Sequence, residues 1–434
     1  MNKEKLFEEV ESSARSYCRS FPTVFTQSKG SLIYDNKGNK FVDFLSGAGA
    51  LNYGHNNDVI KNSVMSYLEK DGIAMSLDLH SQSKLEFIEA FSSCILKPRN
   101  LEYKIQFTSP TGTSVVESAV KLARKYTKRE NVVCFTNAFH GMTGVSLSLT
   151  GSNSHRQGQS YSNVTRFPFE GYAGSEFNSI DYYRKLLTDP SSGIDLPAAI
   201  ILETVQAEGG LNVASVEWLQ DLRLLTSELG ILLIIDDIQT GCGRSGSFFS
   251  FERAGIKPDL VCLSKSIGGM GLPMALLLID SALDVWRPAE DNGTFRGNNL
   301  AFVASTAMVK HFWSDEKFEL EVADKALYIN QYLNQIVAKY PALCIKTKGI
   351  GLMQGIEMRD EAYSEFLVKD CFANGVIVER CGPHDEVFKL MPALTIDYTT
   401  LNQGFAVIDA AFAKLSNQTV NTSQTADAGE GRYV

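Results

Sequence analysis

The sequence lacks the features that would place the protein in a membrane or on nucleic acid. Its 434 residues contain no apolar run that approaches the ~18 residues of a membrane span. The N-terminal stretch MNKEKLFEEVESSAR is too charged for a signal peptide. Lys and Arg form no extended run, and the net charge is −9 with a pI near 5.3. We therefore expect a cytoplasmic protein with neither nucleic acid nor a membrane as a partner.

Disulfides and metal sites are not indicated either. The eight cysteines are scattered without C-x-x-C spacing, and the six histidines contain no H-x-x-x-H pair. Disulfides belong mainly to secreted proteins, and zinc sites need suitably spaced cysteine or histidine ligands. We expect reduced core thiols and no metal.

The composition that is present favours a globular protein with a large core. Hydrophobic residues make up 44% of the chain and charged residues 21%. A helix is predicted from Glu4 to about Tyr17, and residues 31–44 have the alternation of a hairpin around the turn Asp35–Gly38. From about Leu79, short apolar strands alternate with helices. This pattern indicates an α/β fold with a mostly parallel sheet covered on both faces.

Seven stretches are predicted as strands of that sheet, and helices are predicted between several of them. The strands are YKIQF (103–107), NVVCF (131–135), SLSL (146–149), AAIIL (198–202), ILLIID (231–236), LVCL (260–263) and ALLLI (275–279). The helices include Ser114–Tyr126, Ser175–Leu187 and Val216–Leu229.

The pattern also predicts a division of the chain. An N-terminal segment (1–78) packs with a small domain, and a large domain (79–310) contains the main sheet. The small α+β domain (311–415) is predicted from a long helix at 316–338, helices near 361–374 and 400–415, and the strands CIKTKG, LMQGIEM, VIVER and VFKLM. The polar, aperiodic residues 416–434 are predicted to be a disordered tail.

Residues that could bind a ligand follow four of the predicted strands. In open α/β sheets, ligands bind beyond the carboxyl ends of the strands. A turn rich in Thr, Ser and Gly, which includes Gly112 and Thr113, opens a helix after the first strand. Such a turn offers backbone N–H groups to a phosphate, although an ordinary capped turn has the same sequence. Phe139, after NVVCF, offers a flat ring or simply core packing.

Charged residues follow the other two strands. Asp236 and Asp237 come after five apolar residues, where a carboxylate is costly without a fixed partner such as a salt bridge or helix cap. Lys265 follows another buried strand. Desolvation there would lower the pKa of its amine and make it nucleophilic, whereas a side chain that reaches solvent at the edge of the sheet would remain an ordinary surface lysine.

Together these residues suit pyridoxal 5′-phosphate. Its aldehyde bonds to a lysine, its ring nitrogen needs an acid, and its phosphate needs a cradle. The string G-x-G-x-x-G at Gly241, Gly243 and Gly246 is not a dinucleotide fingerprint, because the aspartates precede it and no helical pattern follows it.

Six motifs resemble the class III pyridoxal-phosphate aminotransferases of fold type I. They occur in the order of that family and are SPTGTSVVE, FHGMT, ETVQAEGG, DDIQTGCGRSG, LSKSIGGMGLP and GTFRGNNLA. The resemblance covers roughly residues 15–415 and implies a homodimer, or a dimer of dimers, with active sites at the interface. The stretches RSYCRSFP (15–22) and GAGALNYGH (47–55) resemble the diaminobutyrate subgroup of the ectoine-pathway type.

The resemblance implies a role for each matching residue. Lys265 forms the Schiff base with the cofactor and shuttles the proton, and Asp236 partners the ring nitrogen. The other cofactor contacts are Phe139 and Ile238 on the two ring faces, Gln239 at the ring hydroxyl, Gly112 and Thr113 at the phosphate, and Thr294 at the phosphate of the other protomer's cofactor.

Two positions depart from many members of the class. Met142 stands where F-H-G-R-T has an arginine, and Lys389 stands where an arginine pairs with Glu208 or binds a substrate carboxylate. A lysine is a point charge, so it holds a carboxylate less rigidly than a bidentate arginine does. Arg19 and Asn52 lie in the stretches that resemble the subgroup. The predicted substrate-binding residues are Glu208, Lys389, Asn52 and Arg19.

The implied reaction moves the amino group of L-glutamate to L-aspartate 4-semialdehyde, giving L-2,4-diaminobutyrate and 2-oxoglutarate. Other activities stay open at this point. They are another class III aminotransferase acting on ornithine, 4-aminobutyrate or a pathway-specific diamine, and a class III aminomutase or epimerase. A non-catalytic binding role is disfavoured by the intact Lys265 and Asp236.

Overall fold

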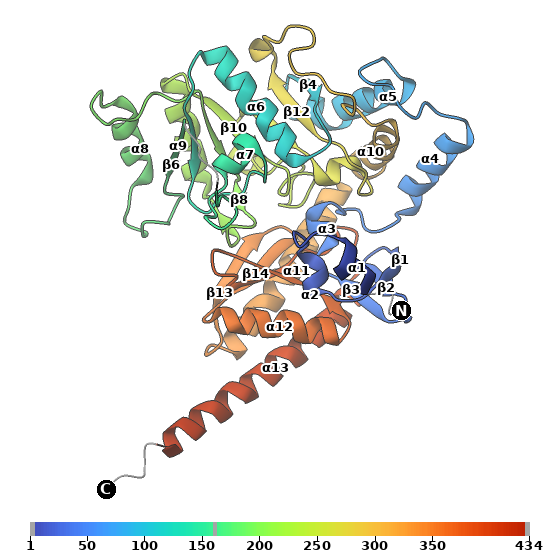
Figure 1. Cartoon of the computed structure of the whole chain (residues 1–434), viewed down its shortest axis with the longest axis vertical. Coiled ribbons are helices and arrows are strands. Elements are labelled where there is room, and N and C mark those ends of the chain that lie inside the picture. The colour runs from blue at the N-terminus through green and yellow to red at the C-terminus, as the bar shows by residue number, and fades with distance from the viewer. Residues whose placement is uncertain (1–4, 159–162, 430–434) are drawn as a thin grey trace.

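The large sheet occupies the upper half of the molecule in Figure 1. The computed structural model describes residues 5–158 and 163–429, with side chains as far as Thr419 in the last helix. The seven strands lie in the order β4 (Tyr103–Phe107), β12 (Leu276–Asp280), β11 (Leu260–Leu263), β10 (Leu232–Asp236), β7 (Ala199–Leu202), β5 (Val132–Phe135) and β6 (Val164–Phe167). Only β12 runs antiparallel to its neighbours, so the predicted mostly parallel sheet is confirmed.

One predicted strand is wrong. The SLSL stretch lies in helix α7 (Gly144–Leu149), and β6 takes the seventh place in the sheet. All four residues of SLSL are buried, so the alternation of Ser and Leu does not separate a wet face from a dry one. Ser146 and Ser148 instead donate hydrogen bonds to the carbonyls three residues earlier, which lets serine sit in a buried helix.

Both faces of the large sheet are buried, as continuous apolar strands predict. In β10, Leu233 and Ile235 belong to one hydrophobic cluster, while Leu232 and Ile234 belong to another that includes residues of α6. The helices of this part of the chain are α4 (Asp58–Glu69), α5 (Gln82–Phe91), α6 (Gly112–Thr127), α8 (Ser179–Thr188), α9 (Val216–Glu228) and α10 (Asn299–Phe312). Because both faces of the sheet are covered, a ligand can reach the strands only at their ends, and the carboxyl ends are the ones where ligands bind in such sheets.

A second, four-stranded sheet lies below the first in Figure 1. Its order is β13 (Cys344–Ile350), β14 (Met353–Met358), β17 (Val387–Leu390) and β16 (Glu379–Cys381), and α11 (Lys317–Lys339) and α12 (Glu361–Ala373) pack against it. The stretch VIVER, predicted as one strand, is divided. Its first two residues form β15 (Val376–Ile377), which belongs to a different sheet from β16.

The N-terminal hairpin is completed by this distant strand. β1 (Phe25–Lys29), β2 (Leu32–Asp35) and β3 (Lys40–Asp43) are antiparallel neighbours, which confirms the predicted hairpin, and β15 pairs parallel to β3. The helix predicted from Glu4 is two short helices, α1 (Lys5–Val10) and α2 (Tyr17–Ser20), and Glu4 lies outside the described residues. Other short elements include α3 (Ser46–Gly49), β8 (Val205–Gln206) and β9 (Asn212–Val213).

The last helix is longer than expected. α13 runs from Tyr398 to Gly429, so the residues from 416 to 429 continue a helix where a disordered tail was expected. From residue 416 to residue 428 the sequence contains no glycine or proline, and each added residue of a formed helix completes one more backbone hydrogen bond. Residues 430–434 lie outside the described part, and the domain boundaries stay predictions. No described helix is long and apolar enough to cross a membrane.

Candidate active site

A cavity of about 250 Å³ lies at the carboxyl ends of the central strands. It brings together eight residues that the sequence singled out for cofactor or substrate contacts. They are Gly112, Thr113, Phe139, Glu208, Asp236, Ile238, Gln239 and Lys265. Met142, His140, Gly141, Glu203 and Thr240 line the same cavity. The strand-end rule therefore located this group of side chains correctly in space.

Lys265 is held in an unusual backbone conformation. It follows β11 and begins a short 3₁₀ helix, Lys265–Gly268, with a φ of +52°. A non-glycine residue in the left-handed region is strained, and such strain is concentrated at functional positions. Burial lowers the pKa of the Lys265 amine, and the nearby Lys389 ammonium adds to this while Glu208 opposes it. The amine is thereby made more available as a nucleophile and as a proton carrier.

Asp236 ends β10 and is paired with a buried histidine. Its Oδ2 lies 2.7 Å from Nδ1 of His140, and its Oδ1 accepts the backbone N–H of Ile238 at 3.2 Å. Burial alone would lower the pKa of His140, but the hydrogen bond and charge of Asp236, together with Glu203, raise it. The pair fixes the Asp236 carboxylate at the wall of the cavity, where it can accept a hydrogen bond from a protonated ring nitrogen.

The adjacent aspartate has a different environment. Asp237 accepts hydrogen bonds from the hydroxyl of Thr240 at 2.6 Å and from the backbone N–H of Ser250 at 3.0 Å. Burial raises the pKa of Asp237 to about 6 despite these hydrogen bonds. Asp237 does not line the cavity, so the two neighbouring carboxyls serve opposite sides of the strand.

Glu203 and His140 are site residues that the sequence analysis did not assign. Glu203 follows β7, is almost fully buried, and accepts the backbone N–H of Phe139 at 2.9 Å through Oε1. Burial raises the pKa of Glu203 to about 7, with His140 opposing the shift and Asp236 adding to it. Both residues lie at strand ends inside the quoted motifs, so their position was a usable signal.

The opposite end of the cavity is the start of a long helix. Helix α6 begins at Gly112, and the Thr111 hydroxyl caps it by accepting the N–H of Ser114 at 3.3 Å. The Thr113 hydroxyl contacts Ser146 and accepts the N–H of Met142 at 3.1 Å. A side chain at Gly141 would place its Cβ 2.2 Å from Thr113 Oγ1. This close approach requires glycine and leaves a compact, positively polarised helix end.

Pyridoxal phosphate fits this set of groups. The helix N-terminus suits a phosphate, Lys265 suits an aldehyde, and Asp236 suits a ring nitrogen. The Oε1 atom of Gln239 is buried with no hydrogen-bond partner, although its Nε2 is held by the Ala48 carbonyl at 2.9 Å. A ring hydroxyl is the donor that this unpartnered oxygen lacks.

Beside the cavity, a lysine lies between two carboxylates, one of which, Glu208, lines the cavity. Lys389 of β17 is fully buried, and its Nζ lies 3.1 Å from Glu208 Oε1 and 3.0 Å from Glu379 Oε1. Glu379 is directly opposite Lys389 on the neighbouring strand β16. The sequence analysis missed Glu379, because the pairing depends on a strand register that sequence alone does not give.

The charges in this cluster shift one another. Burial would lower the pKa of Lys389, but Glu208 and Glu379 raise it well above its ordinary value. Burial would raise the pKa of Glu208, but Lys389 and Lys265 lower it. Burial does raise the pKa of Glu379, with Lys389 opposing. Lys389 therefore stays protonated, and of its two partners Glu379 takes up a proton more readily than Glu208 does.

Three of the four predicted substrate contacts do not line the cavity; they are Lys389, which pairs with Glu208 beside it, Asn52 and Arg19. Asn52 is fully buried, donates to the Cys242 carbonyl at 3.1 Å, and accepts from Arg244 at 2.6 Å, so its side-chain amide is engaged inside the protein. Arg19 is exposed and donates to carbonyls of its own segment. In the same stretch, Tyr17 lies close enough to the Lys389 cluster to be affected by its charges. Desolvation and the charges of Glu379 and Glu208 raise the pKa of the Tyr17 hydroxyl to about 12.

Thr294 also lies outside the cavity of its own chain. Its side chain is exposed on the loop between β12 and α10, beside Phe295, which is 62% exposed. The position is compatible with a contact to another protomer.

Comparison with known proteins identifies the family. The sequence model of the family described as "Aminotransferase class-III" matches residues 13–412, nearly the whole chain. The chain is a class III aminotransferase. The cofactor of the class, pyridoxal phosphate, is the group that the cavity fits.

The aminotransferase has many relatives of almost the same length. A diaminobutyrate–2-oxoglutarate transaminase of Halalkalibacterium halodurans is 50% identical over 412 residues, which is 94% of this chain and 96% of the relative. Transaminases of the same name from Virgibacillus pantothenticus and Bordetella bronchiseptica are 50% and 46% identical, covering 94% and 99% of this chain and 98% and 99% of the relatives.

Solved structures share the fold of this aminotransferase. An ornithine aminotransferase from Toxoplasma gondii superposes with a TM-score of 0.84 at 20% identity, covering 95% of this chain and 94% of that one. An S-selective transaminase from Bacillus megaterium gives 0.82 at 22% identity, covering 96% and 99%. At these identities the likeness establishes the architecture alone, which agrees with the predicted fold type I.

Proposed function

We propose that this aminotransferase moves the amino group of L-glutamate to L-aspartate 4-semialdehyde, giving L-2,4-diaminobutyrate and 2-oxoglutarate. The observation that carries the proposal is the ~50% identity, over nearly the full chain, to relatives named for diaminobutyrate and 2-oxoglutarate. The cavity supports it, because Lys265 and Asp236 line the same space.

The side chains divide the chemical work among them. Bound pyridoxal phosphate carries the amino group between the two substrates and withdraws the electron pair left when the substrate loses its α-proton. Lys265, with a lowered pKa, takes the proton from the substrate carbon and returns it elsewhere. Asp236, backed by His140, keeps a proton on the ring nitrogen. Phe139 and Ile238 hold the two faces of the ring, and Glu203 fixes the backbone of Phe139.

Selection of the substrate falls to the Lys389 side. Met142 offers no cation at its rim of the cavity, and Lys389 is already shared by Glu208 and Glu379. The cavity thus lacks the two arginines that many class III enzymes place at these positions. Apart from its reacting aldehyde, aspartate semialdehyde carries an ammonium and a carboxylate, whereas 4-aminobutyrate carries only a carboxylate apart from its reacting amine. The semialdehyde therefore suits a cluster of one cation and two anions better than 4-aminobutyrate does.

Steady-state kinetics test the proposed substrate. Diaminobutyrate, ornithine and 4-aminobutyrate are compared as amino donors to 2-oxoglutarate, with aspartate semialdehyde and glutamate in the other direction. We expect the highest kcat/KM for diaminobutyrate. A higher value for ornithine or 4-aminobutyrate contradicts the substrate and leaves the class III chemistry intact. Turnover of a single substrate without 2-oxoglutarate indicates an aminomutase.

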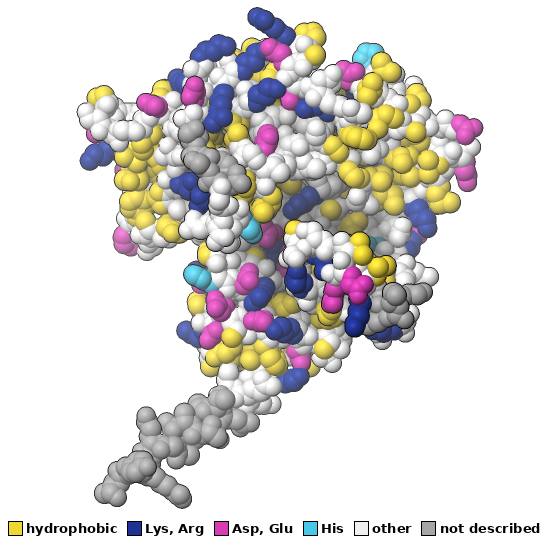
Figure 2. Space-filling model, viewed as in Figure 1, with side chains coloured by type: hydrophobic (Ala, Val, Ile, Leu, Met, Phe, Trp, Pro, Cys, Tyr) yellow, Lys and Arg dark blue, Asp and Glu magenta, His cyan; other side chains and the backbone are white. Residues whose placement is uncertain are grey.

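We also propose that the enzyme is a cytoplasmic homodimer whose product feeds ectoine biosynthesis, and that Thr294 reaches the phosphate of the partner's cofactor. Figure 2 shows hydrophobic side chains gathered over α4 and α5, and Met65, Leu68, Leu77, Leu79 and Leu85 are among the exposed ones. The backbone of Leu77 adjoins Gly297, three residues after Thr294, so the loop that carries Thr294 lies next to the segment that contributes to this apolar surface. All eight cysteines are free thiols, which suits a reducing compartment.

Hybrid dimers test the role of Thr294. Inactive Lys265→Ala chains are mixed with Thr294→Ala chains under conditions that exchange subunits. A mixed dimer places both lesions in one site and leaves the other intact, so activity returns. If exchange is confirmed and activity does not return, Thr294 acts within its own chain.

A further inference from the structure

The loop that carries Thr294 is closed by a tight turn. It joins β12 to α10, and the backbone N–H of Arg296 donates to the Gly293 carbonyl at 3.2 Å. Thr294 and Phe295 occupy the corner of this turn and are exposed. Neither corner residue is held by a side-chain hydrogen bond of its own among those found in residues 5–158 and 163–419. The position of Thr294 therefore depends on what fixes the two ends of the turn.

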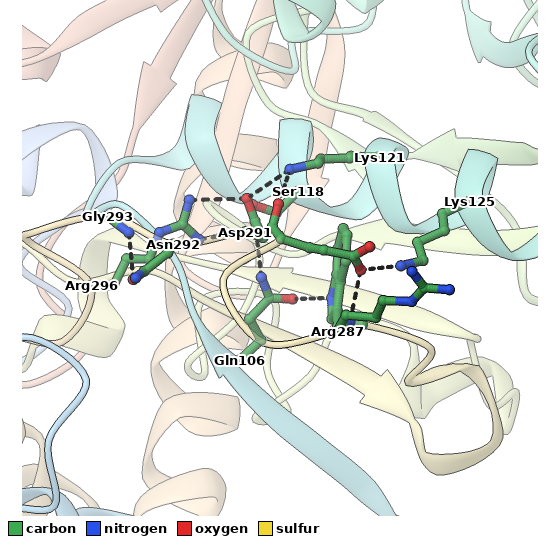
Figure 3. Close-up of polar contacts among 11 residues, drawn as sticks. Gln106, Ser118, Lys121, Lys125, Arg287, Asp291, Asn292, Gly293 and Arg296 are labelled. Carbon is green, nitrogen blue, oxygen red and sulfur yellow. Dashed lines mark hydrogen bonds and ion pairs between the residues drawn. The ribbon is translucent and has the colours of Figure 1, made fainter.

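The Arg296 end of the turn is fixed by one carboxylate, Asp291, which lies at the centre of Figure 3 and precedes Gly293, the other end, by two residues. Arg296 donates to it from both terminal nitrogens, from Nη1 to Oδ2 at 2.9 Å and from Nη2 to Oδ1 at 3.0 Å. Ser118 of α6 donates to Oδ2 at 2.7 Å, Gln106 of β4 donates to Oδ2 at 2.5 Å, and Lys121 lies 3.6 Å from Oδ1. The turn is thus tied to the large sheet and to the helix whose N-terminus faces the cofactor cavity.

The charge on Asp291 is secure at neutral pH. Burial alone would raise its pKa, but the hydrogen bonds of Arg296 and Ser118 and the charges of Arg296 and Lys121 lower it. The Asp291 and Arg296 side chains are only 11% and 13% exposed. A bidentate pair of this kind, held away from solvent, fixes direction as well as distance.

The neighbouring acid, Glu290, is a natural contrast. It pairs with Lys125 and accepts the backbone N–H of Arg287 at 2.7 Å, with no contact to Arg296. Its side chain is 33% exposed. Glu290 and Asp291 therefore share a loop and a charge, but only Asp291 is connected to the turn that carries Thr294.

We infer that Asp291 is a positioning residue for cofactor binding: through Arg296 it holds the Thr294 turn in place to meet the phosphate of the partner's cofactor. The inference rests on the proposed role of Thr294. Neutralising Asp291 breaks the charge-assisted bonds and leaves Arg296 without its anion, so the corner of the turn is free to move. The cost falls on the phosphate contact and leaves the covalent bond to Lys265 untouched.

The test is to titrate the cofactor-free dimer with pyridoxal 5′-phosphate and, separately, with pyridoxal, which lacks the phosphate. Binding is followed by absorbance in Asp291→Asn, Glu290→Gln and the unaltered enzyme. We expect Asp291→Asn to weaken pyridoxal phosphate about tenfold, the effect of losing one charged hydrogen bond, and to leave pyridoxal within about twofold. Glu290→Gln should leave both affinities within about twofold. Arg296→Gln, which breaks the same pair from the other side, should repeat the selective loss.

Each other outcome has a definite reading. Equal weakening of both ligands, or equal effects of Asp291→Asn and Glu290→Gln, overturns the inference, because the carboxylate then acts through the fold in general. Thr294→Ala is titrated alongside. If it binds pyridoxal phosphate normally, the proposed role of Thr294 fails. If it is weakened while Asp291→Asn and Arg296→Gln are not, only the positioning role fails. Melting curves of the cofactor-free variants identify any that do not fold. If Asp291→Asn does not fold, the titrations of Arg296→Gln decide whether the inference holds.

Discussion

Asp236 and Lys389 are both buried charges beside the same cavity, but the groups that compensate them are arranged differently. Asp236 has one main partner, His140, and both residues lie at strand ends of the large sheet. Lys389 has two partners, Glu208 from the large domain and Glu379 from its own small sheet. The cofactor side is therefore a closed one-to-one pair, whereas the Lys389 side holds one more anion than cation.

The difference matches what each side has to bind: the Asp236 side binds one unchanging group, the ring nitrogen, and the Lys389 side is proposed to bind two substrates in turn. A ring nitrogen needs the same proton through every step, and a one-to-one pair on one rigid sheet supplies it. In the proposed reaction, two substrates with different charges bind in turn, and the Lys389 side is the part of the site proposed to select them. A cation shared by two carboxylates, one from the turn between β8 and β9 and one from β16, can exchange one partner without being left unpaired in a buried place. The variants below test this contrast.

The largest effect is expected at Lys265, which serves both sides. Lys265→Ala should lower kcat by about 10⁴-fold, the upper range for a missing acid–base group, while the cofactor still binds through its phosphate. Single-turnover absorbance with glutamate measures the loss. Lys257→Ala, an exposed lysine paired with Asp280, is the matched control and should behave as the unaltered enzyme. If borohydride labels any lysine other than Lys265, the assignment is wrong.

Removing the cation of the Lys389 side should cost stability first. Lys389→Met leaves Glu208 and Glu379 facing each other, and breaking such a buried pair costs about 3 kcal/mol. Both folded-state pKa values rise without the ammonium, so the loss is full at pH 8 and shrinks toward pH 5 as the carboxyls take up protons. Denaturant unfolding at the two pH values measures it. A loss independent of pH would show that packing, and not charge, is responsible.

The two aspartates give the third prediction. Asp236→Asn should lower kcat about 10²-fold, roughly 2.7 kcal/mol of barrier, because an amide cannot hold the ring proton. Asp237→Asn should change kcat only a few-fold, since Asp237 is bonded to Thr240 and Ser250 and does not line the cavity. Equal losses in the two variants would remove the distinction between them.

The smallest effect is expected at Glu203. Its pKa rises from 4.5 in the unfolded chain to about 7 in the fold, so the folded state holds a proton that the unfolded state has lost. The enzyme therefore loses stability as the pH rises from about 4.5 to 7. Glu203→Gln keeps an acceptor for the Phe139 N–H and avoids that loss. It should be more stable than the unaltered protein at pH 8 and nearly equal to it near pH 4.5. A constant difference across this range would contradict the buried charge.

The same contrast explains what the sequence could and could not predict. Lys265, Asp236 and Gly112 were predictable because each follows an apolar strand, and parallel strands bring their carboxyl ends to one edge. Glu379 was not, because its pairing with Lys389 depends on the register of two short strands. SLSL, an alternating tetrapeptide, fits a strand and a buried helix equally well, and VIVER gives no sign that it divides between two sheets.

The parallel pairing of β15 with β3 has a consequence for how the chain is made. The edge of the N-terminal hairpin is complete by residue 43, but the strand that covers it ends at Ile377. At about 5–20 residues per second, a ribosome needs roughly 15–70 seconds to synthesise the intervening chain. During that interval the nascent hairpin has an open edge that can pair with another nascent chain. Slow or paused translation between the two segments should therefore increase aggregation of this enzyme, even though the finished fold covers the edge.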